Sequence, residues 1–385
     1  MVITAFSFIM SIFWFNIFII VIILMRKRTS IIVNFNIIPL LLLVLVCFLR
    51  LFCFFEMPYT LVVPSESIFP QVIDCLTSPI LQLNILNISI CLLNVFTSVW
   101  VIGIIYFLNR YIVHSICINK AICRDEGTNN SQILACMNEL IDSSGKHTKV
   151  KVIQNKAITI PMIIGFFQPT IYLPDIPLTE KEIKNILLHE WTHFLNKDSW
   201  VKLFIYLISA VFWWNPFVHI LSENLNHILE VRCDLKLTYK MNEAQRVEYL
   251  ETIKKIIKYK VNLVSTPQYT KLAGISALIS TNNMKKISQR FYLVLNVKYK
   301  KNQIITSIPL YLMILLLTLF SYMFVLQPSY EPTTTYNKPE IYEITPENAY
   351  LKPNNNNTYD LYADGKYRAI VDNINVEPFS SLPIK

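Results

Sequence analysis

The chain has 385 residues, of which 53% are hydrophobic and 16% are charged, and its formal net charge is +9. This composition is too apolar for an ordinary water-soluble protein and places the chain in a lipid bilayer. The positive charge would suit nucleic-acid binding, but the sequence has no DNA-reading motif. Basic residues on the inner side of a membrane explain the excess, so we expect no direct contact with nucleic acid.

Four apolar runs are long enough to cross a bilayer, which takes about 20 helical residues. They comprise residues 2–25, 37–55, 86–108 and 304–326. The first run is not a typical signal peptide, because no basic residue precedes it and Arg26, Lys27 and Arg28 follow it. The pattern predicts a multi-pass α-helical membrane protein.

The basic residues predict how these helices are oriented, since loops on the cytoplasmic side are enriched in Lys and Arg. Residues 56–85 contain neither, whereas residues 26–28 and the segment after residue 110 are rich in both. We therefore expect a cell-membrane protein whose N-terminus and C-terminal tail lie outside. The predicted domains are three transmembrane helices within residues 1–108 with an extracellular loop at 56–85, a cytoplasmic domain at 109–303, a fourth transmembrane helix at 304–326 and a short extracellular tail at 327–385.

The cytoplasmic part is predicted to contain strands followed by a helix. Residues 149–173 are rich in alternating β-branched residues, which predicts strands. Thr179 and Glu182 then form a T-x-x-E capping box in front of a periodic apolar run. This signal predicts a helix over residues 183–195.

That helix carries an HExxH motif, His189-Glu190-Trp191-Thr192-His193. Residues four apart leave the same face of a helix one turn apart, so the two imidazoles can bind one Zn²⁺ ion. Glu190 can then act as the catalytic base that takes a proton from a water molecule activated by the metal. The alternative interpretation is a core helix with two hydrogen-bonded histidines.

A catalytic zinc site of this kind needs a third protein ligand. Residues 225–237 form a second helical stretch, in which Glu230 and Asp234 lie four apart. We expect Glu230 to be the third ligand and Asp234 to orient a ligand histidine. One alternative is that the third ligand is Glu223, His227 or His219. A second is that Glu230 and Asp234 simply belong to a solvated helix face. We expect the neighbouring Cys233 to pack rather than to bind metal.

A fifth apolar run, residues 200–221, lies between the two halves of this site. If it crossed the bilayer once, Glu230 and His189 would be on opposite sides of the membrane and could not share a metal ion. Asn215 and Pro216 interrupt the run. We therefore expect a membrane-associated hairpin that returns the chain to the cytoplasmic side.

Together these features resemble the BlaR/MecR-type membrane zinc metallopeptidases over residues 1–326. The resemblance rests on HExxH, on E-V-R-C-D at residues 230–234, on W-W-N-P at 213–216, on GFFQPTIYLP at 165–174 and on the basic stretch at 284–296. It implies that residues 109–303 form a cytoplasmic α+β zincin domain of gluzincin-like fold, a zinc-dependent metalloendopeptidase.

The resemblance also implies a substrate. This would be a cytosolic winged-helix repressor of the BlaI/MecI type, or the protease itself near residues 280–291, so that cleavage relays an extracellular signal to transcription. In zincins an edge strand beside the metal helix pairs with extended substrate. We therefore expect residues 165–172 to dock substrate by strand addition, with Gly165, Phe166 and Phe167 as binding residues. A homodimer is a further expectation.

The tail departs from the family pattern. Residues 327–385 are too few for the penicillin-recognising domain of the β-lactam receptors, so we expect no acylation by antibiotics. Asp364 and Gly365 predict a hairpin turn within the tail. Two other functions are compatible with the sequence, a housekeeping membrane endopeptidase of the HtpX type and a non-catalytic membrane receptor in which HExxH is a relic.

Overall fold

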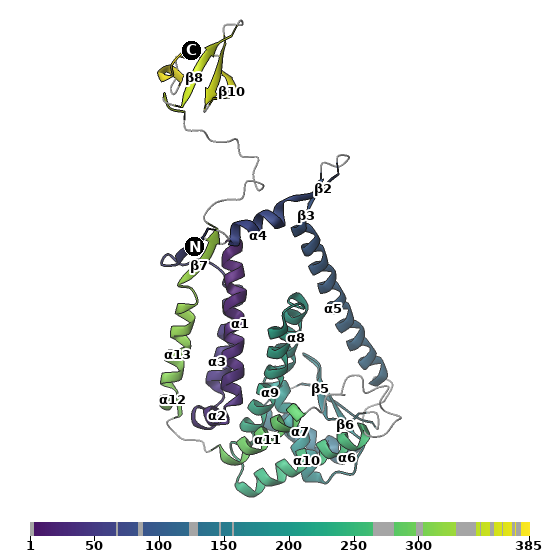
Figure 1. The fold of residues 1–385 in the computed structure, drawn as a ribbon. Coiled ribbons are helices and arrows are strands. Elements are labelled where there is room, and N and C mark those ends of the chain that lie inside the picture. Colours follow the sequence, from purple (N-terminus) through teal and green to yellow (C-terminus); the bar gives the residue numbers. More distant parts are fainter. Residues whose placement is uncertain are drawn as a thin grey trace.

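The structure is a computed structural model, and its described part consists mainly of α-helices with four small sheets (Figure 1). The described residues are 4–66, 68–83, 88–122, 130–145, 148–155, 158–264, 281–297, 303–328, 344–346, 348–354, 358–363, 365–371, 374 and 379–385. Ser280, in the segment expected to be self-cleaved, and Asp364, in the predicted tail turn, lie outside the described residues.

The first two predicted apolar runs form helices that pack against each other. α1 (Ala5–Lys27) is followed by the short α2 (Thr29–Phe35), which leads into α3 (Ile38–Phe52). Thr4 and Ser7 form a capping box at the start of α1. Phe15 and Phe18 of α1 are fully buried in an apolar core that also includes side chains of α3 and α9.

Two described helices are long and apolar enough to cross a membrane, α1 and the part Leu92–Val113 of α5 (Leu92–Ile122). α2 and α3 meet the same criterion only together, as a pair bent by 107°. The fourth predicted run contains α12 (Gln303–Thr306) and α13 (Ile308–Phe320), and α13, with 13 residues, is shorter than a usual span. Each predicted run contains an apolar helix, while the four-span topology stays a prediction.

The predicted extracellular loop contains regular elements, and the third helix starts later than expected. These elements are β1 (Leu61–Ser65), α4 (Ile68–Thr77) and β2 (Pro79–Leu83). β2 forms an antiparallel hairpin with β3 (Ile88–Cys91). Because β3 uses the apolar residues before Leu92 for strand pairing, the prediction that the third helix begins at residue 86 was wrong.

The chain after α13 is joined to α3 and to β1. β7 (Phe324–Pro328) pairs in parallel with β1 over five residue pairs, from Leu61 with Phe324 to Ser65 with Pro328. The guanidinium of Arg50 in α3 donates hydrogen bonds to Oγ and to the carbonyl oxygen of Ser321, both at 3.1 Å. The same group lies 4.2 Å from the centre of the Tyr322 ring. The arginine charge is therefore buried among partners.

An α/β layer follows α5. It begins with α6 (Ser131–Ser144) and contains a three-stranded sheet. Its strands, in spatial order, are β4 (Lys151–Asn155), β6 (Thr170–Pro174) and β5 (Met162–Ile164). β6 is the central strand, parallel to β4 and antiparallel to β5, so β4 and β5 are the edges. The prediction of strands over residues 149–173 is confirmed.

The predicted helix after this sheet is α7 (Glu180–Leu195), and its start is confirmed. Thr179 and Glu182 form the expected capping box, in which each side chain accepts a hydrogen bond from the backbone N–H of the other. Leu187 and Trp191 of α7 are buried in an apolar core with side chains of α6 and the sheet. One face of α7 is therefore fixed against the sheet.

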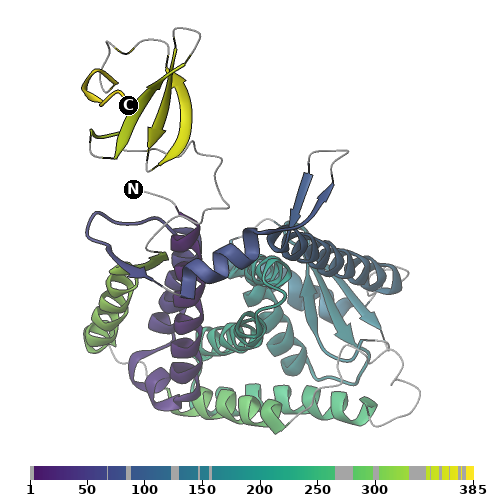
Figure 2. The ribbon, with the colours of Figure 1, turned by 45° about the horizontal axis from the view of Figure 1, so that its top comes forward.

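The fifth apolar run forms a helical hairpin. α8 (Asp198–Val211) ends before residues 212–215, and α9 (Pro216–Thr238) begins where the Asn215 side chain accepts a hydrogen bond from Phe217 N. The two helices pack against each other and lie between α1 and α5 (Figures 1 and 2). The hairpin brings α9 back to α7, as a shared metal site requires. Its association with a membrane stays a prediction.

Two further helices pack against α7 and α9, the helices that carry the predicted metal ligands. α10 (Glu243–Val264) packs against α7, and α11 (Thr281–Asn296) packs against α9, α10 and α2. α11 therefore contacts both the membrane-type helices at the start of the chain and the helix that carries Glu230.

The tail contains a small sheet of its own. β9 (Tyr359–Ala363) and β10 (Lys366–Val371) form the predicted antiparallel hairpin, and β8 (Ala349–Pro353) adds a third strand on the other side of β9. A short 3-10 helix, Phe379–Ser381, follows the sheet. Leu351, Leu361 and Leu382 belong to its apolar core.

Candidate metal centre

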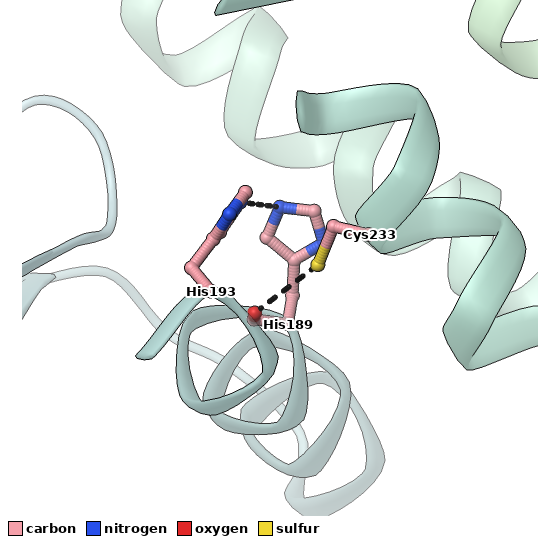
Figure 3. Close-up of side chains that lie close together, drawn as sticks. All are labelled: His189, His193 and Cys233. Carbon is pink, nitrogen blue, oxygen red and sulfur yellow. Dashed lines mark hydrogen bonds between the residues drawn. The ribbon is translucent and has the colours of Figure 1, made fainter. Parts of the chain in front are cut away.

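α7 presents the two histidines of the HExxH motif side by side (Figure 3). The Nε2 atoms of His189 and His193 are 3.1 Å apart. Both side chains are largely buried, with 14% of His189 and 6% of His193 exposed. Because Leu187 and Trp191 fix the other face of α7 in the apolar core, both imidazoles point away from the sheet toward α9.

Glu230 of α9 adds a third donor group. Its Oε2 is 3.5 Å from Nε2 of His189, and its Oε1 is 3.5 Å from Nε2 of His193. In a tetrahedral zinc site with bonds of about 2.0–2.1 Å, two ligand atoms lie about 3.3 Å apart. The two imidazoles and this carboxylate therefore have the spacing and the chemical type that fit a divalent ion such as zinc.

A buried carboxylate contacts the imidazole of His193 at Nδ1, the ring nitrogen that faces away from Glu230. Oδ2 of Asp198, the first residue of α8, is 2.6 Å from Nδ1 of His193. Asp198 is only 1% exposed and also accepts a hydrogen bond from Arg232. An Nδ1–H that donates to a carboxylate leaves the lone pair on Nε2, which is the atom that faces Glu230.

Asp234, which we expected to orient a ligand histidine, reaches His189 through Tyr249. Its Oδ1 is 3.6 Å from Nδ1 of His189, which is too far for a direct hydrogen bond. The hydroxyl group of Tyr249 in α10 lies 2.7 Å from that nitrogen and donates to Oδ1 of Asp234 at 2.7 Å. His189, Tyr249 and Asp234 thus form one buried chain of hydrogen bonds.

Arg290 of α11 contacts both carboxylates of α9. Its Nη1 is 3.0 Å from Oε2 of Glu230. Its Nε and Nη2 donate to the two oxygens of Asp234 at 2.6 and 2.9 Å. The site is therefore assembled from five helices that follow one another in the chain, α7 to α11, with α11 contributing Arg290.

The charges around the site shift the pKa values of its groups. Burial acts to lower the pKa of His193, but the hydrogen bond to Asp198 and nearby anionic groups outweigh burial and raise it to about 10. Burial acts to raise the pKa of Glu230, whereas Arg290 and the imidazoles hold it well below its usual range. Burial raises the pKa of Glu190 against the opposite effect of the imidazoles. The shifts of His193 and Glu230 both favour the charged form of the group, so these surroundings stabilise charge of both signs at the site.

Cys233 also lies near the histidines, so His189, His193 and Cys233 form a second group of atoms close enough for one ion (Figure 3). Its Sγ is 3.4 Å from the main-chain oxygen of His189 and 3.7 Å from Nδ1 of the same residue. That nitrogen already contacts the Tyr249 hydroxyl. Because the thiol approaches Nδ1 and the carboxylate approaches both Nε2 atoms, we favour Glu230 as the third ligand.

The three alternative ligands considered from sequence have other partners. The carboxylate of Glu223 pairs with Lys286, Nε2 of His219 is 2.9 Å from the carbonyl oxygen of Trp213, and Nε2 of His227 is 3.1 Å from Oε1 of Gln289. The geometry therefore selects Glu230 among the acidic and imidazole groups of α9.

His227 is a buried histidine that stays neutral. Burial lowers its pKa to about 4, and the charges of Arg26, Arg290 and Lys286 act in the same direction, while the hydrogen bond with Gln289 acts against them. Protonation of His227 is therefore unfavourable in the folded protein.

A cavity of about 240 Å³ opens onto the histidines. It is lined by residues 160–163 at β5, by Ile253, Ile256 and Ile257 of α10, and by Glu190. Glu190 is 7% exposed. The cavity thus combines apolar walls with the polar groups of the site, as substrate pockets usually do.

The expectation that residues 165–172 provide an edge strand was wrong. Residues 170–172 belong to β6, which has β4 on one side and β5 on the other and so has no free edge. The edge strand beside α7 is β5. Gly165, Phe166 and Phe167 form the turn between β5 and β6, and they do not line the cavity at the histidines.

That turn has its own aromatic surroundings. Gly165 has φ of 123°, and a Cβ atom there would lie 2.6 Å from the carbonyl oxygen of Gln168, so only glycine fits. The rings of Phe166 and Phe167 lie 4.8 and 5.7 Å from the ring of Trp200, at the start of α8.

Sequence reasoning missed three residues of the site, Asp198, Tyr249 and Arg290. Asp198 has a local signal, because an acidic residue five positions after His193 begins the next helix. Tyr249 and Arg290 have no such signal. They lie on helices that only the tertiary fold brings to α7 and α9.

Comparisons with known proteins point to one family. The family model described as BlaR1 peptidase M56 matches residues 4–294. The chain is similar to the regulatory protein BlaR1 of Bacillus licheniformis, with 27% identity over 203 residues, which are 52% of this chain and 32% of that protein. It is also similar to the methicillin resistance mecR1 protein of Staphylococcus aureus, with 23% identity over 188 residues, which are 47% and 31% of the two chains. The chain thus covers about a third of the length of these curated relatives.

Proposed function

Because the chain belongs to the BlaR1 peptidase M56 family, we propose that it is a membrane-embedded zinc endopeptidase of the BlaR/MecR type. It would hydrolyse peptide bonds in a cytosolic protein, or in itself, and so relay an extracellular signal. The observation that carries this proposal is the arrangement of His189, His193 and Glu230, whose donor atoms are 3.1 to 3.5 Å apart.

Each residue of the site has a proposed role in hydrolysis. When bound, the metal ion would act as a Lewis acid that polarises the scissile carbonyl and lowers the pKa of a water molecule. Glu190 would accept the proton of the attacking water and pass it to the leaving amine. Asp198 would accept a hydrogen bond from Nδ1–H of His193, and the Tyr249 hydroxyl would accept one from Nδ1–H of His189, which keeps the Nε2 lone pairs directed at the ion.

The substrate would lie extended along β5. Among the described strands, β5 pairs only with β6, so its outer edge is open, and residues 160–163 line the cavity at the histidines. Backbone hydrogen bonds to such an edge give affinity with little dependence on sequence, while the apolar cavity would select one side chain. Gly165, Phe166 and Phe167 would contact the substrate beyond the end of β5.

We also propose that the apolar helices cross the cell membrane with residues 109–303 on the cytoplasmic side. Support comes from Leu92–Val113 of α5, whose most apolar stretch has none of its residues buried by the described protein. A large exposed apolar face of this kind requires lipid or another protein. On the cytoplasmic side the proposed substrate is a repressor of the BlaI/MecI type, and a homodimer stays an expectation.

The proposal is tested by comparing wild type with Glu190→Gln for cleavage of the candidate repressor and of the chain itself, followed on gels. We expect fragments with wild type and only full-length chains with Glu190→Gln. Metal analysis should give about one zinc per chain, lost in His189→Ala. Equal cleavage by the two proteins, or zinc that is unaffected by His189→Ala, would refute the proposal. Zinc binding without any cleavage would support a non-catalytic receptor instead.

A further inference from the structure

Two neighbouring residues of α11 join different parts of the molecule to the metal centre. Arg290 contacts Glu230 and Asp234 on α9. Gln289 contacts the turn between α1 and α2, as well as His227 on α9. Side chains of α11 therefore bridge this turn and the carboxylates of the site.

The contact of Arg290 with Glu230 limits where that carboxylate can point. Glu230 is a long side chain and 30% of it is exposed, so without a partner it would sample several rotamers. The planar guanidinium holds Oε2 at 3.0 Å while the same oxygen lies 3.5 Å from Nε2 of His189. A carboxylate oxygen has two lone pairs, so it can accept from Arg290 and still be available to a metal ion.

Arg290 also supports a second proposed ligand, His189. Two of its nitrogens bind both oxygens of Asp234, which is 2% exposed. Asp234 in turn accepts from the Tyr249 hydroxyl that contacts Nδ1 of His189. One guanidinium thus fixes the Glu230 carboxylate directly and the His189 imidazole through two intermediates, a task that needs its planar set of donors.

Gln289 ties the same turn of α11 to the end of α1. Its Nε2 donates to the carbonyl oxygen of Arg26 at 2.9 Å and to Oγ1 of Thr29 at 3.2 Å. Its Oε1 is 3.1 Å from Nε2 of His227. All the hydrogen-bonding groups of the Gln289 side chain are therefore directed at α9 or at the turn between α1 and α2.

We propose that α11 completes the metal centre, with Arg290 as a positioning residue for Glu230 and His189, and that Gln289 makes this positioning depend on contact between α11 and the turn after α1. The inference rests on the proposed metal site. It assigns a route by which a rearrangement of the apolar helices changes the affinity of the site for its metal ion.

In the competing interpretation, Arg290 weakens metal binding instead of strengthening it. A guanidinium beside a ligand oxygen repels a divalent cation, and it would then compete with the metal for Glu230. The two interpretations predict opposite signs. If Arg290 positions the ligands, its removal weakens metal binding, whereas if it competes with the metal, its removal strengthens binding.

The first test measures zinc affinity of the full chain in detergent by competition with a chelator. We expect Arg290→Ala to weaken zinc binding by about 10- to 100-fold, the usual effect of losing a partner that orients a ligand. Arg290→Lys keeps the charge but not the planar donors, so it should weaken binding at least about tenfold as well. If Arg290→Ala does not fold, Arg290→Lys alone decides.

Lys286→Ala is the matched control. Lys286 lies on the same helix and pairs with Glu223 of α9, away from the proposed ligands. Its loss should change zinc affinity less than about fivefold, the upper range for an ordinary ion pair. Unchanged or tighter zinc binding in both Arg290 variants, or an equal loss in Lys286→Ala, would overturn the role of Arg290.

The second test measures hydrogen exchange of the backbone with and without zinc at the turn between α1 and α2, followed on a peptide that covers this turn and α2. Because coupling between two sites is reciprocal, zinc should slow exchange in this turn of the wild type, and Gln289→Ala should remove most of that protection. No effect of zinc on the turn in wild type, or the same effect in Gln289→Ala, would overturn the coupling. Wild-type protein that binds no zinc, or binds it equally in His189→Ala, would refute the proposed function itself.

Discussion

Removal of a single oxygen atom, in Tyr249→Phe, tests whether support of His189 determines metal affinity. The hydroxyl lies 2.7 Å from Nδ1 of His189 and 2.7 Å from Oδ1 of Asp234, and Tyr249 is 1% exposed. Phenylalanine keeps the ring and its packing, so the change leaves no large cavity. What it removes is the link between an imidazole and a buried carboxylate.

The magnitude follows from the geometry. A hydrogen bond to a charged group contributes about 1.5–3 kcal/mol, and about 1.4 kcal/mol corresponds to a factor of ten in affinity. Without the hydroxyl, Nδ1 of His189 and Oδ1 of Asp234 face each other at 3.6 Å, so a small shift restores part of the loss. We therefore expect zinc binding to weaken about tenfold, at the lower end of the range for such partners.

The assay is a competition titration with a zinc chelator on wild type, Tyr249→Phe and the control Tyr206→Phe. The hydroxyl of Tyr206 donates to the carbonyl oxygen of Phe107 at 3.1 Å, away from the site, so its loss should leave zinc affinity unchanged. Wild-type affinity in Tyr249→Phe, or the same loss in both variants, would refute the idea that this hydroxyl orients a ligand.

Three further predictions concern catalysis, the second histidine and pH. Glu190→Gln should lower the rate of peptide hydrolysis by about 10²- to 10⁴-fold while zinc content, measured by metal analysis, stays at the wild-type level. Asp198→Asn should weaken zinc binding by about 10- to 100-fold in a chelator titration, because the acceptor for Nδ1 of His193 loses its charge. The pKa of His227 is about 4 in the folded protein, against an ordinary value of 6.5, so between these pH values the unfolded chain binds more protons. The free energy of unfolding therefore falls as pH falls through this window, by up to about 3 kcal/mol. Thermal unfolding midpoints measured from pH 7 to 4 should therefore fall less steeply in His227→Gln than in wild type.

The sequence could predict those residues of the site whose pattern lies within one helix, but not contacts between residues far apart in the chain. The capping box of Thr179 and Glu182 and the spacing of His189 and His193 are properties of one helix, and the structure has this helix where the pattern predicts it. Glu230 came from a second helix through the type and spacing of its residues. Arg290 is 56 residues from its partner Asp234, and no periodicity of either helix indicates that contact.

The sheet is a second case in which the sequence predicted the elements but not their arrangement. Alternating β-branched residues predict that residues 149–173 form strands, and they do. Whether a strand lies at an edge depends on its partners. β6 is the central strand because it pairs with β4 on one side and with β5 on the other. β5 is therefore the edge strand on the side of α7. A pattern along one strand carries no information on that choice.

The parallel pairing of β1 with β7 determines how a mechanical load on the tail would be shared. A pull on the chain beyond Pro328 acts along the length of β7, so all the hydrogen bonds between Leu61–Ser65 and Phe324–Pro328 bear it at once in shear. The hydrogen bonds from Arg50 to Ser321 lie three residues before the start of β7 and add a further attachment between this segment and α3. Tension on the tail would therefore be transmitted through β1 to α3, the helix that precedes it in the chain, and would not act on α13 alone.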